Sequence, residues 1–513
     1  MKQITSSKSF TQLTAGLSEA AVCSTGPVGA DVPILGVTAD SRQVQNGFAF
    51  VAVRGFVHDG HAFIGDAIRA GAPAIVYQDS AFDDAVPNAV ARLRVSDTRR
   101  ALAIIADRFY DHPSGELKLV GVTGTNGKTT TVAVLDSVFR AAGCKTGTIG
   151  TLGATVLDSH IPGDRTTPDA VGLQSLLADM VRSSVTHAAM EVTSHALDLC
   201  RVYQTAFAAG VFCNLSQDHL DWHHTMDSYF ASKAAFFTDY VDFSPDMVAA
   251  INLDDPYGAR MAEVARCEVT GYAIESAADV RASDVQLSPT GTVFMLQLPG
   301  HSLPVHSALV GRFNVYNCLA AAAAAYALGF DPEAIASGLT SVTGADGRFE
   351  RVDVGQPFTV LVDYAHTPEA LQNVLEAARS LRPQRLICVF GCGGDRDRTK
   401  RPRMGEVTTK LADLTVITSD NPRSEDPDAI IADIIRGTLA GKFRVEADRR
   451  AAIALAIAEA QAEDLVLIAG KGHETYQEFA DGRIDFDDRL VAAAVLREQG
   501  YGRDSTDSKV RES

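Results

Sequence analysis

Disulfide bonding and membrane insertion find little support in this 513-residue sequence. It has eight cysteines without a CxxC pair, and only Cys388 and Cys392 lie close together, at the end of an apolar run. Such scattered cysteines favour reduced thiols in a cytosol over a disulfide framework. The first residues lack the continuous apolar core of a signal peptide, and no stretch reaches the roughly 20 apolar residues of a membrane span. We therefore expect a cytoplasmic protein that does not insert into membranes.

A strongly basic region is also missing. The chain carries 64 acidic against 46 basic residues, a formal net charge of -18, which repels nucleic-acid phosphates. The longest basic-rich run, 396–403, is short and is interrupted by Asp397 and Pro402. We expect a local anion site there, small-molecule partners, no nucleic acid, and a monomer.

Apolar runs alternate with helical periods along most of the chain, which is the pattern of α/β domains with mainly parallel sheets. The chain is too long for one hydrophobic core, so we divide it at two stretches rich in turn residues. The prediction is an α/β domain at 1–112, a central P-loop ATPase-like domain with a mainly parallel sheet at 113–346, and a Rossmann-like domain at 347–500. Residues 501–513 have the composition of a disordered tail.

The segment "LKLVGVTGTNGKTT" predicts a phosphate-binding loop between a strand and an amphipathic helix. Gly124 and Gly127 allow backbone amides to face an anion, Lys128 supplies positive charge, and Thr129 offers a hydroxyl to magnesium. The common nucleotide-loop pattern would place a glycine where this chain has Val122. A plain strand-to-helix turn is the alternative.

Other strands and one helix follow from the same periodicity. We expect a helix at 99–110 and strands at 117–122, 188–192, 208–214 and 247–252. In the third domain four apolar strands each run into a polar tip: "TVLVDYAHTP", "LICVFGCGGDRDR", "LTVITSDNPRSEDP" and "LVLIAGKGHE". Because ligands of open parallel sheets bind beyond the carboxyl ends of the strands, these tips predict one shared site.

Candidate metal ligands follow the central strands. Glu191 ends one predicted strand, His219 follows the next, and Lys233 lies on a predicted helix. A carboxylate and an imidazole at neighbouring strand ends can hold a divalent cation beside a triphosphate, and magnesium prefers oxygen ligands. The alternatives are zinc held by His219, Asp221 and His223, a surface position for His223 and His224 without metal, and a solvated Lys233.

Eight motifs occur in the order found in Mur ligases: "GTNGKTT", "MEVTSH", "NLSQDHLD", "GRFNVYN", "DYAHTP", "GCGGDRDRTKRP", "DNPR" and "AGKGHE". The chain resembles this family from about Val37 to Arg489, and is similar to the branch that makes UDP-N-acetylmuramoyl-tripeptide. The family loop is GTNGKT, so the resemblance accounts for Val122. It implies a UDP-binding first domain, a central ATP-binding domain and a third domain that binds the incoming amino acid.

The resemblance also implies a reaction. ATP would phosphorylate the glutamyl carboxylate of UDP-N-acetylmuramoyl-L-alanyl-D-glutamate, and an amine would attack the acyl phosphate. Arg423 in "DNPR" stands where relatives that add meso-diaminopimelate keep an arginine, whose fork can grip a second carboxylate. The alternatives are L-lysine as the amine, pairing of Arg423 with Glu425 or Asp426, a folylpolyglutamate-type ligase, and a nucleotide-hydrolysing switch without ligation.

Site residues are carried over from the resemblance by position. Two magnesium ions would be held by Thr129, Glu191, His219 and a carbamylated Lys233, and the catalytic set would be Lys128, Glu191, His219 and Lys233. ATP would contact Gly124, Thr125, Asn126, Gly127, Lys128, Thr129, Thr130, Asn317, Arg348 and Asp363. The UDP substrate would contact Ala39, Ser41, Thr166, Thr167, Thr193 and Arg201, and diaminopimelate would contact Arg401, Asp420, Asn421, Pro422, Arg423, Gly470 and Glu474.

At three positions the sequence departs from the family pattern or allows another role. Arg165 and Leu199 depart from the family pattern beside the UDP-substrate residues, so contacts there are expected to be rearranged. Asn317 is expected to open the alanine-rich helix, where capping the helix is its alternative role.

Overall fold

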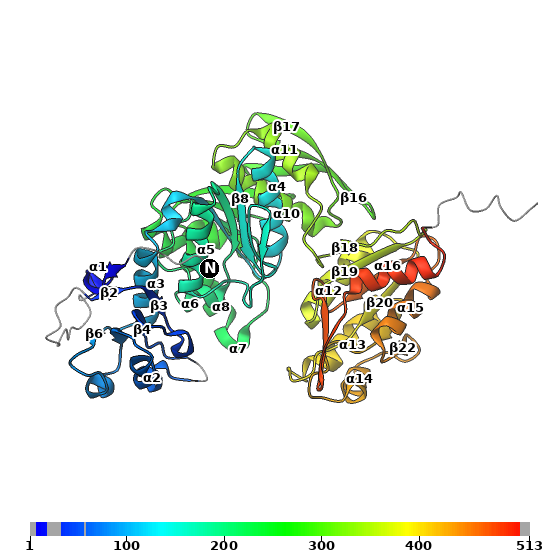
Figure 1. Cartoon of the computed structure of the whole chain (residues 1–513). Helices are drawn as coiled ribbons and strands as arrows, with labels where there is room; N and C mark the ends of the chain where they lie inside the picture. Colours follow the sequence, from blue (N-terminus) through cyan, green and yellow to red (C-terminus); the bar gives the residue numbers. More distant parts are fainter. Residues whose placement is uncertain (1–6, 18–31, 56–57, 503–513) are drawn as a thin grey trace, which may run out of the picture. The chain divides into compact units, whose positions relative to one another are not determined.

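The computed structural model describes residues 7–17, 32–55 and 58–502 (Figure 1). The chain divides into two compact units: unit 1 falls within 1–281 and 319–338, and unit 2 within 282–318 and 339–513. Most of the tail predicted at 501–513 lies outside the described residues. The seven cysteines in the described part are free thiols. None of the described helices combines the length and apolarity needed to cross a membrane.

Unit 1 begins with a small three-layer α/β arrangement. A short β1–β2 pair (Lys8–Ser9, Pro33–Ile34) accompanies a parallel sheet of order β3-β4-β5-β6. One sheet face packs against α1 and α3, and the other against α2. The bounds are β3 Gly36–Thr38, β4 Phe48–Val51, β5 Ala74–Tyr77, β6 Ala91–Arg94, α1 Phe10–Thr14, α2 Ile64–Arg69 and α3 Thr98–Phe109.

A larger, mainly parallel sheet follows in unit 1, in the order β10-β9-β8-β11-β7-β12-β13-β14. Among these strands the pairs β8–β9 and β9–β10 are antiparallel, so only β9 runs opposite to the others. The strands predicted at 117–122, 188–192, 208–214 and 247–252 are confirmed, as is the helix at 99–110. The bounds are β7 Lys118–Thr123, β8 Thr146–Gly150, β9 Gly153–Val156, β10 Ser159–Ile161, β11 His187–Glu191, β12 Ala209–Phe212, β13 Val248–Asn252 and β14 Glu268–Ala273.

Helices cover this sheet. Helix α4 (Lys128–Ala141) contacts β8 and β11, while α5 (Ala170–Arg182) and α8 (Met226–Thr238) contribute to an aromatic-rich core. Gly143 follows α4 with φ +77°, as expected of a residue that ends a helix. The remaining helices with residues in unit 1 are α6 Ser194–Asp198, α7 Leu220–His223, α9 Gly258–Val264, α10 Arg312–Ala327 from residue 319 onward, and α11 Pro332–Ser341 up to residue 338.

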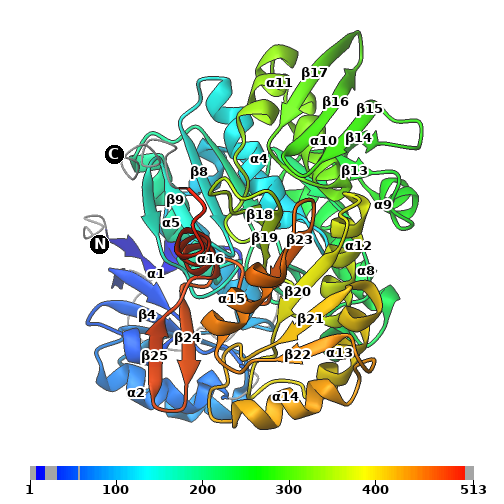
Figure 2. The ribbon, with the colours of Figure 1, turned by 90° about the vertical axis from the view of Figure 1, so that its right-hand side faces the viewer.

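Unit 2 contains a six-stranded sheet of order β18-β19-β23-β20-β21-β22, parallel except for β18. Side chains alternate between the two faces: one face packs against α12, α13 and α14, and the other against α15 and α16 (Figure 2). The bounds are β18 Glu350–Arg351, β19 Thr359–Asp363, β20 Leu386–Phe390, β21 Leu414–Ile417, β22 Phe443–Val445, β23 Leu465–Ala469, α12 Pro368–Ser380, α13 Lys400–Leu411, α14 Pro427–Ile435, α15 Arg449–Glu459 and α16 Asp488–Glu498.

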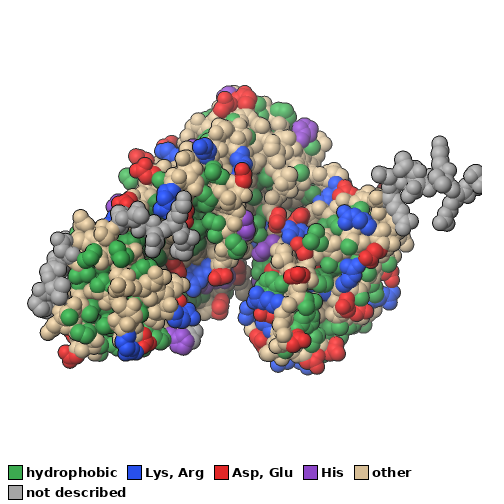
Figure 3. All heavy atoms as spheres, in the orientation of Figure 1, with side chains coloured by type: hydrophobic (Ala, Val, Ile, Leu, Met, Phe, Trp, Pro, Cys, Tyr) green, Lys and Arg blue, Asp and Glu red, His purple; other side chains and the backbone are tan. Residues whose placement is uncertain are grey.

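Two hairpins complete unit 2, and both are antiparallel. One joins β16 (Gly291–Leu298) to β17 (His301–Ser307). The preceding strand, β15 (Val280–Ser288), pairs with β14 only through Val280 and Arg281. The other joins β24 (Tyr476–Phe479) to β25 (Gly482–Asp485). On the face visible in Figure 3, acidic and basic side chains are interspersed over the described residues rather than gathered by sign.

The expected position of Asn317 is wrong. Helix α10 spans Arg312–Ala327, so Asn317 lies inside it and does not cap it. The helix starts earlier because Gly311 takes φ +96° immediately before it, while Asn314 donates from Nδ2 to the Val310 carbonyl oxygen (2.9 Å). The segment "RFNVYN" therefore belongs to the helix.

Close contact between α4 and α11 depends on Gly338. A Cβ atom added there would lie 2.4 Å from Val138 Cα, a backbone atom that cannot rotate away. We expect Gly338→Ala to lower the free energy of unfolding by about 1–3 kcal/mol, because the two helices must separate. Thermal or urea unfolding measures this. Gly115→Ala is the control, since nothing lies within 4 Å of its Cβ, and equal loss in both variants would contradict the prediction.

Candidate functional site

The phosphate loop lies between β7 and α4, as predicted, and an asparagine holds it in shape. Asn214 accepts from Thr125 N at its carbonyl oxygen (3.0 Å) and from Asn126 N at Oδ1 (2.9 Å), and its Nδ2 donates to Asn126 O (3.1 Å). Gly124 packs so closely that an added Cβ would lie 2.9 Å from Cys213 Cβ. Sequence reasoning missed Asn214; its position beyond β12, the neighbour of β7, was the available signal.

Two lysines donate to one carbonyl oxygen of this loop. Lys128 Nζ donates to the oxygens of Gly124 and Thr125, both at 2.9 Å, and Lys233 Nζ donates to Gly124 O at 2.9 Å. Lys233 is buried on α8, as expected of a helix residue but not of a solvated one, and its Nζ lies 4.7 Å from the Tyr229 ring centre. Burial, and then the charge of Lys128, lower the pKa of Lys233 well below its ordinary value.

The start of α4 adds backbone donors to this charge. Gly127 has φ +86°, and the first bond within the helix runs from Thr131 N to Gly127 O (2.9 Å). The N–H groups of Thr129 and Thr130 therefore have no acceptor within the helix. They point out of its N-terminus, where helices bind anions. This favours the phosphate-loop interpretation over a plain turn.

Glu191 is the last residue of β11 and is hydrogen-bonded to a cluster of threonines. Its Oε1 accepts from Thr151 N (2.7 Å) and its Oε2 from Thr151 Oγ1 (3.3 Å), while Thr151 Oγ1 lies 3.1 Å from Thr166 Oγ1. Thr167 Oγ1 donates to the Glu191 carbonyl oxygen (2.8 Å) and lies 3.3 Å from Thr193 Oγ1. The structure thus brings three of the predicted UDP-substrate residues beside Glu191.

Arg201 contacts the same cluster of threonines. Its Nη1 donates to Thr167 O (3.1 Å), and burial, followed by the charge of Arg165, lowers the pKa of its guanidinium. Ala39 and Ser41 lie elsewhere in unit 1, after the carboxyl end of β3, where Asp40 caps the turn Ser41–Gln43.

His219 lies in a cluster of aromatic rings at the start of α7. It adopts φ +51°, its ring centre is 4.8 Å from that of His195, and burial lowers its pKa, which favours the neutral imidazole. Trp222 Nε1 donates to Asp198 Oδ2 (2.8 Å), and the Trp222 ring lies 4.8 Å from His195. Neither His195 nor Trp222 was predicted.

Of the two histidines given a surface position as an alternative above, His224 is exposed but His223 is not. His223 is 3% exposed, and its Nε2 lies 2.9 Å from Ser194 Oγ. Its aromatic neighbour is Tyr229, whose ring stacks on it at 4.7 Å. Within the described ranges, no three His, Cys, Asp or Glu side chains are grouped to hold a metal ion, so the zinc site of His219, Asp221 and His223 does not form.

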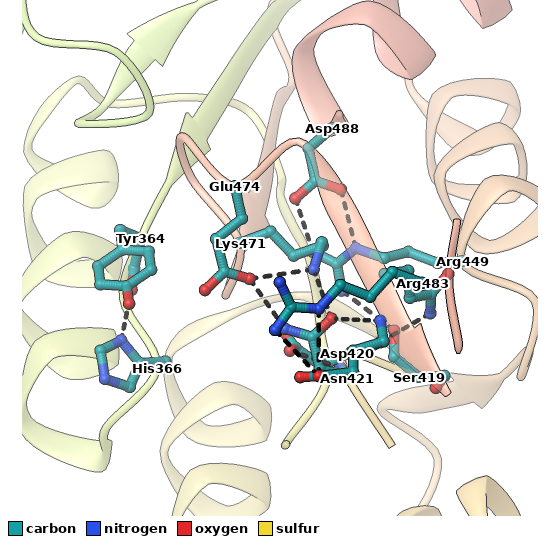
Figure 4. Close-up of polar contacts among 12 residues, drawn as sticks. Tyr364, His366, Ser419, Asp420, Asn421, Arg449, Lys471, Glu474, Arg483 and Asp488 are labelled. Carbon is teal, nitrogen blue, oxygen red and sulfur yellow. Dashed lines mark hydrogen bonds and ion pairs between the residues drawn. The ribbon is translucent and has the colours of Figure 1, made fainter. Parts of the chain in front are cut away.

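In unit 2, the polar tips that follow β21 and β23 contact each other, as the pattern predicted, whereas Tyr364 and His366 after β19 lie to one side of this cluster (Figure 4). Asn421 Nδ2 donates to Glu474 Oε2 (2.9 Å), while Lys471 Nζ donates to Asn421 Oδ1 (2.9 Å) and to Glu474 Oε2 (3.1 Å). Gly470, at φ +121°, leaves room for Asp420, whose Oδ2 would be 2.7 Å from an added Cβ. Lys471 was missed, although it lies between two predicted residues.

A buried ion pair lies beneath this cluster. Arg449 donates from Nε and Nη2 to the two carboxylate oxygens of Asp488 (2.8 and 2.7 Å), and neither side chain is exposed. Burial would raise the pKa of Asp420, but the charges of Arg449 and Lys471 outweigh it and lower that pKa. Asp420 is therefore held as a carboxylate. Nothing in the sequence indicated that Arg449 pairs with Asp488, because the two residues are far apart in the chain.

Arg401 has its charge matched by acidic neighbours. It is fully buried and donates to both oxygens of Glu425 (2.9 and 2.7 Å) and to Asp433 Oδ2 (3.0 Å). Arg423 pairs with Glu478 at 3.1 Å, which corrects the alternative that it pairs with Glu425 or Asp426. Pro422 accepts from Glu425 N at its carbonyl oxygen (3.1 Å) in the turn that carries Arg423.

The predicted ATP residues of unit 2 have partners within the unit. Asp363 accepts from Phe349 N and Ala365 N, both at 2.8 Å, and burial raises its pKa. The Arg348 guanidinium lies 4.8 Å from the centre of the Tyr364 ring, and its Nε is buried without a hydrogen-bond partner in the described structure. Asn317 Nδ2 donates to Asn314 Oδ1 (2.8 Å).

Comparison with known proteins decides the family. Models of the Mur ligase family catalytic domain, the Mur ligase middle domain, and the Mur ligase glutamate ligase domain match residues 33–110, 122–325 and 347–472. A UDP-N-acetylmuramoyl-L-alanyl-D-glutamate–2,6-diaminopimelate ligase of Syntrophomonas wolfei is 45% identical over 475 residues, 92% of this chain and 96% of that protein. The chain belongs to the Mur ligase family. It is accordingly an enzyme of the ligase class.

Solved Mur ligases share the three-domain fold of this family member. The structure of a UDP-N-acetylmuramoyl-L-alanyl-D-glutamate–2,6-diaminopimelate ligase matches with a TM-score of 0.70 at 33% identity, and covers 96% of this chain and 99% of its own. MurF ligase from Thermotoga maritima, solved in complex with ADP, matches with a TM-score of 0.59 at 20% identity, covering 90% and 96%. The second likeness concerns the fold alone.

Lys471 lies at the centre of the polar cluster of this Mur ligase. We expect Lys471→Met to lower the free energy of unfolding by about 1.5–3 kcal/mol, because Asn421 Oδ1 and Glu474 Oε2 lose a buried charged donor. Urea unfolding measures the change. The control Lys410→Met removes an exposed pair with Glu406 and should leave stability unaltered. Equal stability of both variants would show that Lys471 does not hold the cluster together.

Proposed function

We propose that the chain is an ATP-dependent ligase that adds meso-diaminopimelate to UDP-N-acetylmuramoyl-L-alanyl-D-glutamate, a step of peptidoglycan precursor synthesis. The observation that carries the proposal is the pair of lysines on the Gly124 carbonyl, beside the first amides of a helix. Such a site suits a polyphosphate. Similarity over 92% of the chain to ligases of that name supports the substrates. We expect a monomer that acts in the cytoplasm.

The reaction has two steps. The terminal phosphoryl group of ATP passes to the glutamyl side-chain carboxylate, which gives an acyl phosphate and ADP. The incoming amine attacks the acyl carbon, and phosphate leaves as the amide bond forms. Lys128 and the loop amides stabilise the charge on the transferring phosphoryl group. Thr166, Thr167, Thr193 and Arg201 hold the carboxylate substrate, and Ala39 and Ser41 bind its UDP end.

We assign the remaining ATP contacts by family position: Thr125, Asn126 and Thr130 around the phosphates, Asp363 at the ribose, Asn317 at the adenine, and Arg348 at the phosphates. The unpaired Nε of Arg348 supports its assignment, because a buried guanidinium nitrogen without a partner suits an anionic ligand. Each carboxylate oxygen of Asp363 accepts one backbone bond and keeps a lone pair for a ribose hydroxyl.

The residues around the loop fit magnesium. Thr129 Oγ1, the Glu191 carboxylate and the neutral His219 imidazole are suitable ligands, and bound magnesium supplies charge neutralisation at the phosphates. Lys233 fits carbamylation, because only an unprotonated amine attacks carbon dioxide, and burial lowers its pKa well below the ordinary value. The carbamate would supply an anionic oxygen ligand at a position where a protonated lysine would repel the metal ion.

Third-domain residues would select the amine. Arg423 would bind the second carboxylate of diaminopimelate, and Glu474 its distal ammonium, while Arg401 supports the turn through Glu425. Asp420, Asn421, Pro422 and Gly470 line the same strand ends. L-lysine lacks the second carboxylate and would leave Arg423 without an anionic partner from the ligand.

Amine specificity tests the proposed function. Enzyme, magnesium, ATP and UDP-N-acetylmuramoyl-L-alanyl-D-glutamate are incubated with meso-diaminopimelate or with L-lysine, and phosphate and product are measured. We expect amine-dependent phosphate release and a kcat/KM preference for diaminopimelate of roughly 10⁴, because a site built for a charged group rejects the analogue that lacks it. Phosphate release without amine would favour a nucleotide-driven switch. A preference for lysine would refute the role of Arg423.

Carbamylation of Lys233 predicts chemical rescue. Lys233→Ala should retain its fold and lose at least about 100-fold in kcat, because the second carboxylate at the metal site is gone. Added acetate or propionate should restore part of the activity by occupying the space. The control Lys145→Ala removes an exposed lysine and should behave like the wild type. A folded Lys233→Ala enzyme that short carboxylates do not rescue would indicate a structural lysine.

A further inference from the structure

Arg423 is held by the β24–β25 hairpin through the backbone and side chain of Glu478 and through a backbone bridge to Phe479. The Arg423 backbone N–H donates to Glu478 O (3.0 Å), and Arg423 Nε donates to Glu478 Oε2 (3.1 Å). Asn421 Oδ1 accepts from Glu478 N (3.0 Å), so the hairpin also fixes the neighbouring site residue. Arg423 adopts φ +53°, a conformation that the surrounding contacts must stabilise.

Glu478 divides its two oxygens between two arginines. Its Oε2 accepts from Arg423, while its Oε1 accepts from both Nε (3.1 Å) and Nη2 (3.0 Å) of Arg483 on β25. The hydrogen bond from Arg483 is the main reason that the pKa of Glu478 is lowered. Arg483 also lies over the Tyr476 ring, 4.4 Å from its centre.

This division leaves one nitrogen of Arg423 without a protein partner. Nε bonds to Glu478 and Nη1 donates to Gly394 O (2.9 Å), whereas Nη2 has no hydrogen-bond partner among residues 7–17, 32–55 and 58–502. A carboxylate free of other partners would take Nε and Nη2 together, since bidentate pairing is the preferred geometry. Arg483 prevents this by holding Oε1.

We propose that Arg483 determines specificity at a distance: by holding Glu478, it keeps Nη2 of Arg423 available for the second carboxylate of the incoming amino acid. The inference rests on the proposed function, in which Arg423 binds that carboxylate. Two guanidinium groups share one carboxylate in this arrangement, so the group of three carries one net positive charge. A dicarboxylic amino acid complements that charge, and a monocarboxylic one does not.

Steady-state kinetics of Arg483→Gln test the proposal. Released from Arg483, Glu478 can pair bidentately with Arg423 and compete with the ligand. We expect KM for meso-diaminopimelate to rise about tenfold, the loss of one charge-assisted bond, with kcat within about twofold and KM for ATP unchanged. The preference over L-lysine should fall by a similar factor. An unchanged KM for diaminopimelate, or an equal rise in KM for ATP, would overturn the proposal.

Two further variants keep the test decisive. Arg483→Lys retains a cation for Glu478 and Tyr476 and should restore most of the wild-type KM; a variant as impaired as Arg483→Gln would contradict the proposal. Arg444→Gln is the matched control, because Arg444 is 57% exposed against 59% for Arg483 and pairs with Glu459. If the wild-type enzyme prefers L-lysine, the proposed function fails. If the wild-type enzyme prefers diaminopimelate and Arg483→Gln has the same kinetic constants as the wild type, only this inference fails.

Discussion

The carbonyl oxygen of Gly124 accepts hydrogen bonds from two lysines, and the chemistry of unit 1 depends on this crowding. Two ammonium groups that share one acceptor, one of them fully buried, repel each other at short range. The site can relieve the repulsion by binding an anion or by keeping Lys233 neutral. Either outcome suits an ATP-dependent peptide ligase, and a neutral amine is also the form that carbon dioxide can modify.

Several features of the fold could be predicted because they depend on local pattern. Continuous apolar runs gave the buried parallel strands, and glycines that need positive φ marked the ends of α4. The division into units could not be predicted this way. Contacts between distant segments place residues 282–318 and 339–346 in unit 2 and group the rest of the first two predicted domains in unit 1. No local composition reports such contacts.

The candidate site was predictable as far as it follows strand ends. Glu191 was found because a polar residue at the end of a buried strand has few structural reasons to be there, whereas Lys233 and Asn421 came from the family resemblance. Asn214 and Arg449 were missed, since their roles depend on a partner far away in the sequence: the loop backbone for Asn214 and Asp488 for Arg449. The partner of Arg423 was wrong for the same reason, because a hairpin rather than a sequence neighbour supplies Glu478.

Trp222 is the single tryptophan of the chain. Its indole donates a hydrogen bond to Asp198 and faces the His195 ring. Trp222 lies three residues after His219 in the sequence. Long-wavelength ultraviolet light that only indole absorbs appreciably therefore excites one position in the molecule. The protein carries a built-in optical label next to its candidate metal ligand, and its emission spectrum can follow ligand binding at equilibrium without a dye, a coupled enzyme or turnover.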